Sequence, residues 1–355
     1  MKIKIAFLDT DGKYLSMLVS TLNAKYADEF ELYSFTDPEY AMKSIADARI
    51  NVLVASVSFG IDRKAVPESC ALAFFTADAS MGELYGCQTI GKYQRIENIY
   101  RKLIELSADN CVGASSFIRK EGDSTLITFS SPCRGTGTST LAAACAIRLA
   151  AQGRSVFYLN LERFGGADVF FGGDTQNISK VIYALKASHG NQSVNLGAKI
   201  KSCILRSQDG VNYFAAPDLP LDMNGFDADS IDTLIGELNG GFDYIIVDID
   251  FSISDVYPKT LAASHRFVWC SDGTDAGNFK LSRTLSAICS LEQEKGLSVP
   301  ERVRLIYNKM DKYSTASEFV GINCVGLIPY TPGGASSSAK LALGLSKLDI
   351  FDKLL

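Results

Sequence analysis

The sequence predicts an α/β protein in which two parallel sheets are each covered by helices. Three observations support this fold class: short apolar segments alternate with amphipathic ones, the alternation occurs in two series, and a polar segment separates them. The chain has 355 residues, which is long for one domain and sufficient for two. We therefore expect a first domain at 1–107, a linker at 108–123 and a second domain at 124–355.

The first series contains short apolar segments that are typical of strands, at 3–8, 30–35, 50–56, 70–77 and 86–93. Amphipathic stretches such as KYLSMLVSTLNAKY lie between them, as expected for parallel strands joined by crossover helices. The intervals 57–68 and 78–84 are short for helices of such a unit.

The second series is longer and predicts a larger doubly wound sheet. Its expected strands are TLITFS, SVFYLN, VNYFAAP, YIIVDID, RFVWCS, VRLIYNK and INCVGLIP. A long helix is predicted from Ser139, with Gly153 as its stop.

Composition limits the possible functions. Residues are 47% hydrophobic and 21% charged, no apolar run approaches the roughly 20 residues that span a bilayer, and the start lacks a signal-peptide pattern, so we expect a cytoplasmic protein without an integral membrane segment. Nine scattered cysteines without a C-x-x-C pair argue against a disulfide framework or a structural zinc site, and two histidines are too few for a His-rich centre. The net charge of −5 disfavours nucleic acid as a partner.

The stretch SSPCRGTGTSTLA, at 130–142, lies between a predicted strand and an Ala-rich helix. A strand, a glycine-rich turn and a helix in succession bring backbone N–H groups and a helix N-terminus to phosphate oxygens. The pattern G-x-x-x-x-G-K-[ST] is matched at Gly137 and at Ser139, whose hydroxyl would bind Mg²⁺, but Pro132 replaces the first Gly and Thr138 the Lys. Losing that contact, worth about 1.5 to 3 kcal/mol, weakens phosphate binding without abolishing it. An ordinary Gly-containing turn is the alternative.

Other predicted strand ends also carry polar residues. Asp248 follows an apolar strand, where a carboxylate reaches a metal-bound water beside the β- and γ-phosphates. Glu162 either orients an attacking water or is a solvated strand-end carboxylate. Asn308 ends another strand, and VGLIPYTP follows where a base-binding loop would lie. Together these positions predict a nucleotide site.

On these residues, 124–355 resembles the MinD/ParA family of deviant Walker P-loop ATPases. The family loop K-G-G-x-G-K-[ST]-T aligns with Cys133, Arg134, Gly135, Thr136, Gly137, Thr138, Ser139 and Thr140. Both lysines are absent, including the signature lysine that in the family reaches the partner's nucleotide across a dimer. We hypothesise that Arg134, next to that position, takes over part of its role.

The resemblance implies ATP and Mg²⁺ as cofactors, a homodimer formed through the ATPase domain, and roles for individual residues. It places the Walker B carboxylate on Asp248 and the switch I residues on Asn160 and Glu162, so that Glu162 and Asp248 are the expected catalytic residues. Ser139 and Asp248 are the expected metal-binding residues.

The resemblance also implies where the base binds. Asn308 is the expected adenine contact, and the loop that closes over the base is expected at Pro329, Tyr330 and Thr331. The segment NKMD, at 308–311, also resembles the guanine-reading motif of GTPases, whereas the family context favours adenine.

The first domain resembles a response-regulator receiver domain, which has a flavodoxin-like fold. Asp9 and Asp11 match the receiver's acidic pair, Thr76 its hydroxyl residue and Lys92 its lysine. Ser56 stands where the phosphoacceptor aspartate belongs, so phosphorylation by the usual chemistry is not expected. The two aspartates are interpreted as strand-end polar residues on an inert scaffold, with a metal site as the alternative.

A degenerate receiver followed by a MinD/ParA-like half resembles the TadZ/CpaE family, which positions tight-adherence (Flp) pilus secretion machinery at a cell pole. The resemblance implies an ATP-dependent homodimer that localises other pilus components. We expect slow hydrolysis, because the loop has lost positive charge. The alternatives are a receiver-linked transcriptional regulator, for which no helix-turn-helix is visible, and a ParA-like DNA-segregation ATPase, which the acidic balance disfavours.

The C-terminal segment SAKLALGLSKLDIFDKLL has the leucines of an amphipathic helix. Leu341, Leu345, Leu348 and Leu355 fall on one predicted face. The opposite face mixes lysines with aspartates, whereas membrane-surface helices are rich in Lys and Arg, so we expect a packed terminal helix.

Overall fold

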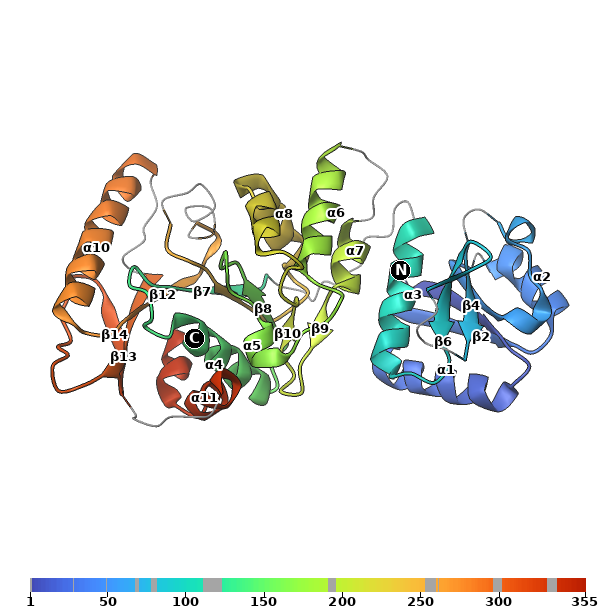
Figure 1. Ribbon diagram of the computed structural model, residues 1–355, viewed down its shortest axis with the longest axis horizontal. Coiled ribbons are helices and arrows are strands. Elements are labelled where there is room, and N and C mark those ends of the chain that lie inside the picture. The colour runs from blue at the N-terminus through green and yellow to red at the C-terminus, as the bar shows by residue number, and fades with distance from the viewer. Residues whose placement is uncertain are drawn as a thin grey trace. The chain divides into compact units, whose positions relative to one another are not determined.

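The computed structural model describes residues 2–27, 29–48, 50–67, 70–77, 82–110, 123–190, 196–252, 260, 262–295, 302–330 and 337–355. They form two compact α/β units, Met1–Ile118 with Ala184–Cys203, and Arg119–Tyr183 with Ile204–Leu355 (Figure 1). Most of the predicted linker, 111–122, and the predicted base-loop residue Thr331 lie outside the described residues.

The first unit contains a six-stranded sheet in the order β2-β1-β3-β4-β6-β5. Its strands are β1 (Ile3–Leu8), β2 (Phe30–Phe35), β3 (Val52–Ser56), β4 (Ala71–Thr76), β5 (Glu83–Leu84) and β6 (Cys87–Gly91). Its helices include α1 (Gly12–Tyr26), α2 (Pro38–Ala48) and α3 (Ile96–Asn110). All the strand pairs are parallel except that between β5 and β6.

Both faces of this sheet are buried, which explains why its strands are nearly continuous apolar runs. Along β1, Ile5 and Phe7 belong to the core cluster that includes α1 and α3, whereas Ala6 and Leu8 belong to the cluster that includes α2.

Two features of the first unit depart from a regular alternation of strands and helices. In the described part of 57–68 the chain forms only two short 3₁₀ turns, Val57–Phe59 and Arg63–Ala65, in agreement with the brevity of that interval. Helix α3 continues to Asn110, past the predicted domain end at residue 107.

The second unit contains an eight-stranded sheet in the order β14-β13-β12-β7-β11-β8-β10-β9. Its strands are β7 (Thr125–Ser130), β8 (Val156–Asn160), β9 (Leu205–Arg206), β10 (Asn212–Tyr213), β11 (Tyr244–Asp248), β12 (Arg266–Ser271), β13 (Val303–Met310) and β14 (Asn323–Pro329). The pairs are parallel except for β9 with β10. Strand β7 therefore lies inside the sheet, between β11 and β12.

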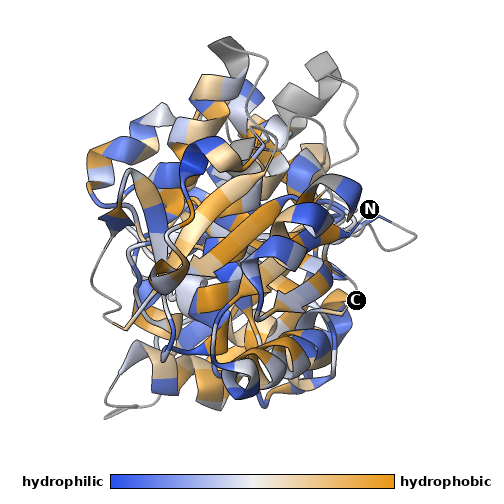
Figure 2. Cartoon of the chain, turned by 90° about the vertical axis from the view of Figure 1, so that its right-hand side faces the viewer, coloured by the Kyte–Doolittle hydropathy of each residue, from blue (hydrophilic) through white to orange (hydrophobic). Residues whose placement is uncertain are grey.

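Helices cover this second sheet on both faces. They are α4 (Thr138–Ala151), α5 (Asp168–Phe171), α6 (Ile178–Gly190), α8 (Ala228–Leu238), α10 (Asp275–Lys295) and α11 (Ser338–Leu345). Helix α7 (Leu196–Ser202) and the end of α6 from Ala184 group with the first unit instead. In Figure 2 the strands are largely orange, whereas the helices carry both orange and blue residues, as amphipathic covering helices should.

Helix α4 follows β7 directly and packs in the core of this unit. Its side chains from Leu141 to Ile147 are buried, and small alanines permit this close packing. The helix begins at Thr138, one residue before the predicted start, and the following Gly153 has φ +80°, as predicted for a helix stop.

The C-terminal segment packs against the core, as predicted, but the predicted leucine face is wrong. The helix stops at Leu345, and the remaining residues form a 3₁₀ turn at Asp349–Leu354, so one helical period does not extend through the segment. Leu341 is 37% exposed and Leu355 49%, while Phe351 is buried. Within the described part of the chain, no helix is both long and apolar enough to cross a bilayer.

Candidate functional site

The loop between β7 and α4 depends on two glycines. Gly135 has φ +78° and Gly137 has φ +84°, both in the left-handed region that residues with a Cβ rarely adopt. A Cβ at Gly137 would lie 2.6 Å from Nδ2 of Asn308, so this position also lacks space for a side chain. The loop therefore has the tight turn that the sequence predicted.

The first turn of α4 presents free backbone donors to the loop. Among the described residues, the N–H groups of Thr138, Ser139 and Thr140 donate to no protein acceptor, and the N-cap Gly137 offers no side chain. Unpaired N–H groups and the positive end of the helix dipole favour an anion here.

A pocket of about 380 Å³ opens over this helix end. Its lining brings together all of the predicted loop residues, Cys133, Arg134, Gly135, Thr136, Gly137, Thr138, Ser139 and Thr140, with Ser131, Glu162, Ile249, Asp250 and Lys309. The geometry therefore gathers backbone donors, hydroxyls, carboxylates and one ammonium group around the same space.

Asp248 ends β11 just before Ile249 and Asp250 of the pocket lining, and it is completely buried. Its Oδ2 accepts hydrogen bonds from the hydroxyl of Tyr158 at 2.7 Å and from Nδ2 of Asn160 at 3.1 Å. Burial raises the pKa of Asp248 well above its usual value, and the neighbouring charge of Glu162 raises it further. Its Oδ1 is buried and accepts no hydrogen bond of normal geometry from the described residues.

Glu162 lies just beyond β8, and its carboxylate faces the same space. Its Oε2 lies 3.4 Å from Nδ2 of Asn160. Burial raises the pKa of Glu162, and the charge of Asp250 adds to the rise, while hydrogen bonding to Ser139 and Asn160 opposes it. Two carboxyl groups are thus held together in a place where negative charge is costly.

An unpaired carboxylate oxygen at Asp248, a second carboxylate and the hydroxyl of Ser139 fit a magnesium ion. Among the described residues, no group of three or more His, Cys, Asp or Glu side chains is arranged to hold a metal ion, so the protein alone would supply few ligands. Mg²⁺ is commonly held by one or two protein groups together with substrate phosphates and water. When bound, it would supply positive charge to the phosphate oxygens.

Asn308 and Lys309, near the end of β13, both contact the loop. Nδ2 of Asn308 donates to the carbonyl of Thr136 at 2.7 Å, and Nζ of Lys309 donates to the carbonyl of Gly135 at 2.7 Å. The amide nitrogen of Asn308 is therefore engaged by the loop, which leaves its oxygen for the predicted base contact. The sequence analysis predicted no function for Lys309. The only sequence feature that pointed to it was its position inside the NKMD segment.

The predicted base loop is described only in part. Pro329 ends β14, and Tyr330 is 56% exposed, with its N–H donated to the carbonyl of Met310 at 2.8 Å. Their contact with a base stays a prediction.

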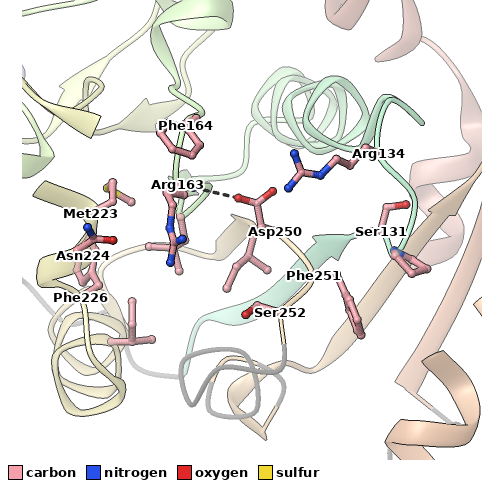
Figure 3. A pocket seen from close by; sticks show the side chains of 14 residues that line it. Ser131, Arg134, Arg163, Phe164, Met223, Asn224, Phe226, Asp250, Phe251 and Ser252 are labelled. Atoms are coloured by element: carbon pink, nitrogen blue, oxygen red, sulfur yellow. Dashed lines mark hydrogen bonds between the residues drawn. The ribbon is translucent and has the colours of Figure 1, made fainter. Parts of the chain in front are cut away.

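Arg134 is among the residues that line the pocket over the start of α4. Its side chain is exposed and points toward the carboxylate of Asp250 in Figure 3, although no ion pair joins them. It also lines a second pocket of about 470 Å³. The walls of this second pocket are mixed: apolar side chains, Leu161, Phe164, Met223, Phe226, Ile231 and Phe251, lie beside polar and charged ones, Ser131, Arg163, Asn224, Asp250 and Ser252. Its proposed role toward a partner's nucleotide remains a hypothesis.

Of the polar residues predicted in the first unit, Lys92 and Asp9 form an ion pair. Nζ of Lys92 lies 2.5 Å from Oδ2 of the buried Asp9. Asp11 instead caps α1, since its Oδ1 accepts hydrogen bonds from the N–H groups of Lys13 and Tyr14. Ser56 ends β3 with its hydroxyl 3.0 Å from that of Ser58.

These features agree with the comparison with protein families. Residues 1–108 match the family described as "TadZ-like, receiver domain". The predicted receiver is thereby confirmed, and its departures from the receiver motif, Ser56 above all, are features of this TadZ-like domain.

Solved structures resemble the second half of the architecture. A ParA family ATPase from Chlorobium tepidum TLS shares 18% identity at a TM-score of 0.51, over 65% of this chain and 96% of that chain. A plasmid partition protein from Borrelia burgdorferi shares 17% identity at a TM-score of 0.49, over 66% of this chain and 100% of that chain. The MinC:MinD cell division protein complex from Aquifex aeolicus shares 14% identity at a TM-score of 0.49, over 65% of this chain and 95% of that chain. No curated protein matches the chain.

Of these three, the Chlorobium structure supports the fold assignment. The TadZ-like receiver domain is accordingly combined with a ParA-type P-loop fold, and the predicted fold class is confirmed.

Proposed function

We propose that this protein binds ATP with Mg²⁺, dimerises in the ATP-bound state and positions components of a tight-adherence (Flp) pilus machinery. One observation carries the nucleotide part: the unpaired N–H groups at the start of α4 lie close to the unpaired, buried carboxylate oxygen of Asp248, because the Ser139 side chain at that helix end lies beside the carboxyl group of Asp248. The first favours phosphate and the second favours a cation, which is the pair of requirements that a magnesium nucleotide meets.

Hydrolysis is proposed to be slow. The loop offers Thr138 where a lysine usually lies, and Arg134 points toward Asp250 (Figure 3). Fixed positive charge beside the transferring phosphate is a large part of the catalysis of phosphoryl transfer, so less of it means slower turnover.

A second copy of the chain is the proposed occupant of the second pocket. This pocket shares Ser131, Arg134, Ile249 and Asp250 with the nucleotide pocket, so an approaching partner would touch the nucleotide-binding loop. ATP binding can then bias dimer formation, because a ligand shifts an equilibrium when its affinities for the two states differ.

The proposed cellular site is the cytoplasmic side of a cell pole, beside membrane-bound pilus components. The TadZ-like receiver domain supports this proposal. The net charge of −5 supports the view that proteins, rather than nucleic acid, are its partners.

The nucleotide proposal is tested by thermal unfolding and light scattering with and without MgATP. A ligand at 100 times its Kd stabilises a protein by about 2.7 kcal/mol, so a clear rise in melting temperature and a shift to dimer are expected. Ser139→Ala should abolish both effects, whereas Ser20→Ala, on the exposed face of α1, should leave them intact. A wild-type protein that shows neither effect at saturating MgATP would overturn the proposal.

The localisation proposal is tested with a fluorescent fusion in a host that carries the pilus genes. Wild-type protein should form polar foci, and Ser139→Ala should be diffuse at equal abundance. Diffuse wild-type fluorescence would remove support for the pilus role while leaving the nucleotide proposal standing.

A further inference from the structure

The end of β13 contains a bulge. Tyr307 pairs with Leu327 of β14 and Met310 pairs with Pro329, so two residues of β13, Asn308 and Lys309, face one residue of β14. Lys309 has φ +62°, in the left-handed region that a residue with a long side chain seldom adopts. Such strain persists where the surrounding structure fixes it, and it is concentrated at functional sites.

The bulge changes where two consecutive side chains point. In a regular strand, neighbouring side chains lie on opposite faces of the sheet, so Asn308 and Lys309 should not reach the same partner. Here both hydrogen-bond to adjacent carbonyls of the loop, Thr136 and Gly135, each at 2.7 Å. A bulge beside a binding site is a known means of redirecting a side chain.

The ammonium group of Lys309 is well placed to meet an anion. It donates one N–H to Gly135 and has no other partner among the described residues, which leaves two donors. The side chain is exposed and lines the same pocket as Thr138 and Ser139. Arg134, the other cation of that lining, points toward Asp250 (Figure 3).

We propose that Lys309 supplies the positive charge that the phosphate-binding loop lacks at Thr138, by contacting phosphate oxygens of the bound nucleotide. The inference rests on the proposed nucleotide binding and assigns the missing cation to β13 instead of to the loop. The bulge and the strained backbone of Lys309 then have a purpose, since they place the ammonium group over the loop.

The test is calorimetric titration of the full chain with MgATP, MgADP and adenosine. Lys309→Met should weaken binding of both magnesium nucleotides about tenfold and leave adenosine affinity unchanged, because adenosine has no phosphate. Lys309→Arg should retain most of the affinity. Lys312→Met is the matched control, since Lys312 lies three residues away over the ring of Tyr313 and should behave as wild type.

The salt dependence of MgATP binding distinguishes a lysine that contacts the phosphates directly from one that only holds the loop in shape. Wild-type affinity for MgATP should fall more steeply with ionic strength than that of Lys309→Met, because the screened attraction has been removed from the variant. A lysine that only holds the loop in shape would lower adenosine and MgATP binding together and leave the salt dependence unchanged.

Unchanged MgATP affinity in Lys309→Met would overturn the inference, and a loss in Arg134→Met instead would assign the cation to Arg134. An equal loss for adenosine would overturn it as well. If the wild-type chain bound no MgATP at all, the proposed function itself would fall, an outcome that the wild-type titration alone reveals.

Discussion

Nζ of Lys92 lies 2.5 Å from Oδ2 of Asp9 inside the TadZ-like receiver domain, with the Asp9 side chain 1% exposed and that of Lys92 18%. The same ammonium group lies 5.5 Å from the ring centre of Tyr14 and 5.8 Å from that of Phe75. Ser56 ends β3, at the position where the receiver resemblance expects the acceptor aspartate, and it offers the lysine no carboxylate. The pair is a structural element of the receiver core.

The first prediction concerns this pair. Lys92→Met should destabilise the receiver domain by about 3 to 5 kcal/mol, because it leaves Asp9 buried without its positively charged partner and with the N–H of Asp11 on its Oδ1. The double variant Asp9→Asn with Lys92→Met should lose less, since it removes both charges. Native-state hydrogen exchange of receiver peptides in the full chain measures the loss, and Lys13→Met, at an exposed position of α1, is the control. A Lys92→Met protein with wild-type protection would contradict a structural role.

The main strands were predictable because burial on both faces makes them apolar throughout, as in β1, β7 and β11. The expected strand VNYFAAP was predicted too long, since only Asn212 and Tyr213 form β10, and beyond them Ala215 makes an isolated bridge to Asn177. An apolar run reports burial, whereas pairing depends on a neighbouring strand that a local pattern does not reveal.

The same distinction applies to the candidate site. The loop could be predicted because its glycine-rich segment is recognisable, and Asp248 could be predicted because it directly follows an apolar strand segment. Lys309 was not, because its role depends on a bulge against β14 and on a positive φ, and both arise from tertiary pairing. The predicted functions of the site residues still await the experiments proposed for them.

The second prediction separates two causes of glycine dependence in the loop. Gly137→Ala should destabilise the protein by about 1 to 3 kcal/mol and remove the stabilisation by MgATP, because the backbone is strained and the new Cβ would lie 2.6 Å from Nδ2 of Asn308. Gly135→Ala is the matched comparison, since its φ is +78° but no atom lies within 4 Å of the added Cβ. Equal effects of the two variants in thermal unfolding would show that the collision with Asn308 is unimportant.

The third prediction concerns pH. Because burial raises the pKa of Asp248 in the folded protein, the folded state retains a proton that the unfolded chain releases above about pH 4. Stability without ligand should therefore fall as pH rises from there toward neutrality, and Asp248→Asn should reduce that fall. The free energy of unfolding of Asp248→Asn minus that of the wild type, measured by chemical unfolding, should therefore become more positive from about pH 5 to pH 8. A difference that shrinks with rising pH would contradict this assignment.

The fourth prediction distinguishes catalysis from binding at Glu162. Its carboxylate lies beside the pocket, and burial raises its pKa, which brings it closer to the range of an effective general base. Glu162→Gln should leave the Kd for MgATP within about threefold but lower phosphate release by about a hundredfold or more, since positioned proton transfer contributes about 10² to 10⁴ in rate. Asp250→Asn is the comparison, because Asp250 lines the same pocket while its Oδ2 accepts the N–H of Arg163 at 3.0 Å. Equal losses of phosphate release in both variants would indicate that the site needs negative charge in general and that Glu162 has no special part in the reaction.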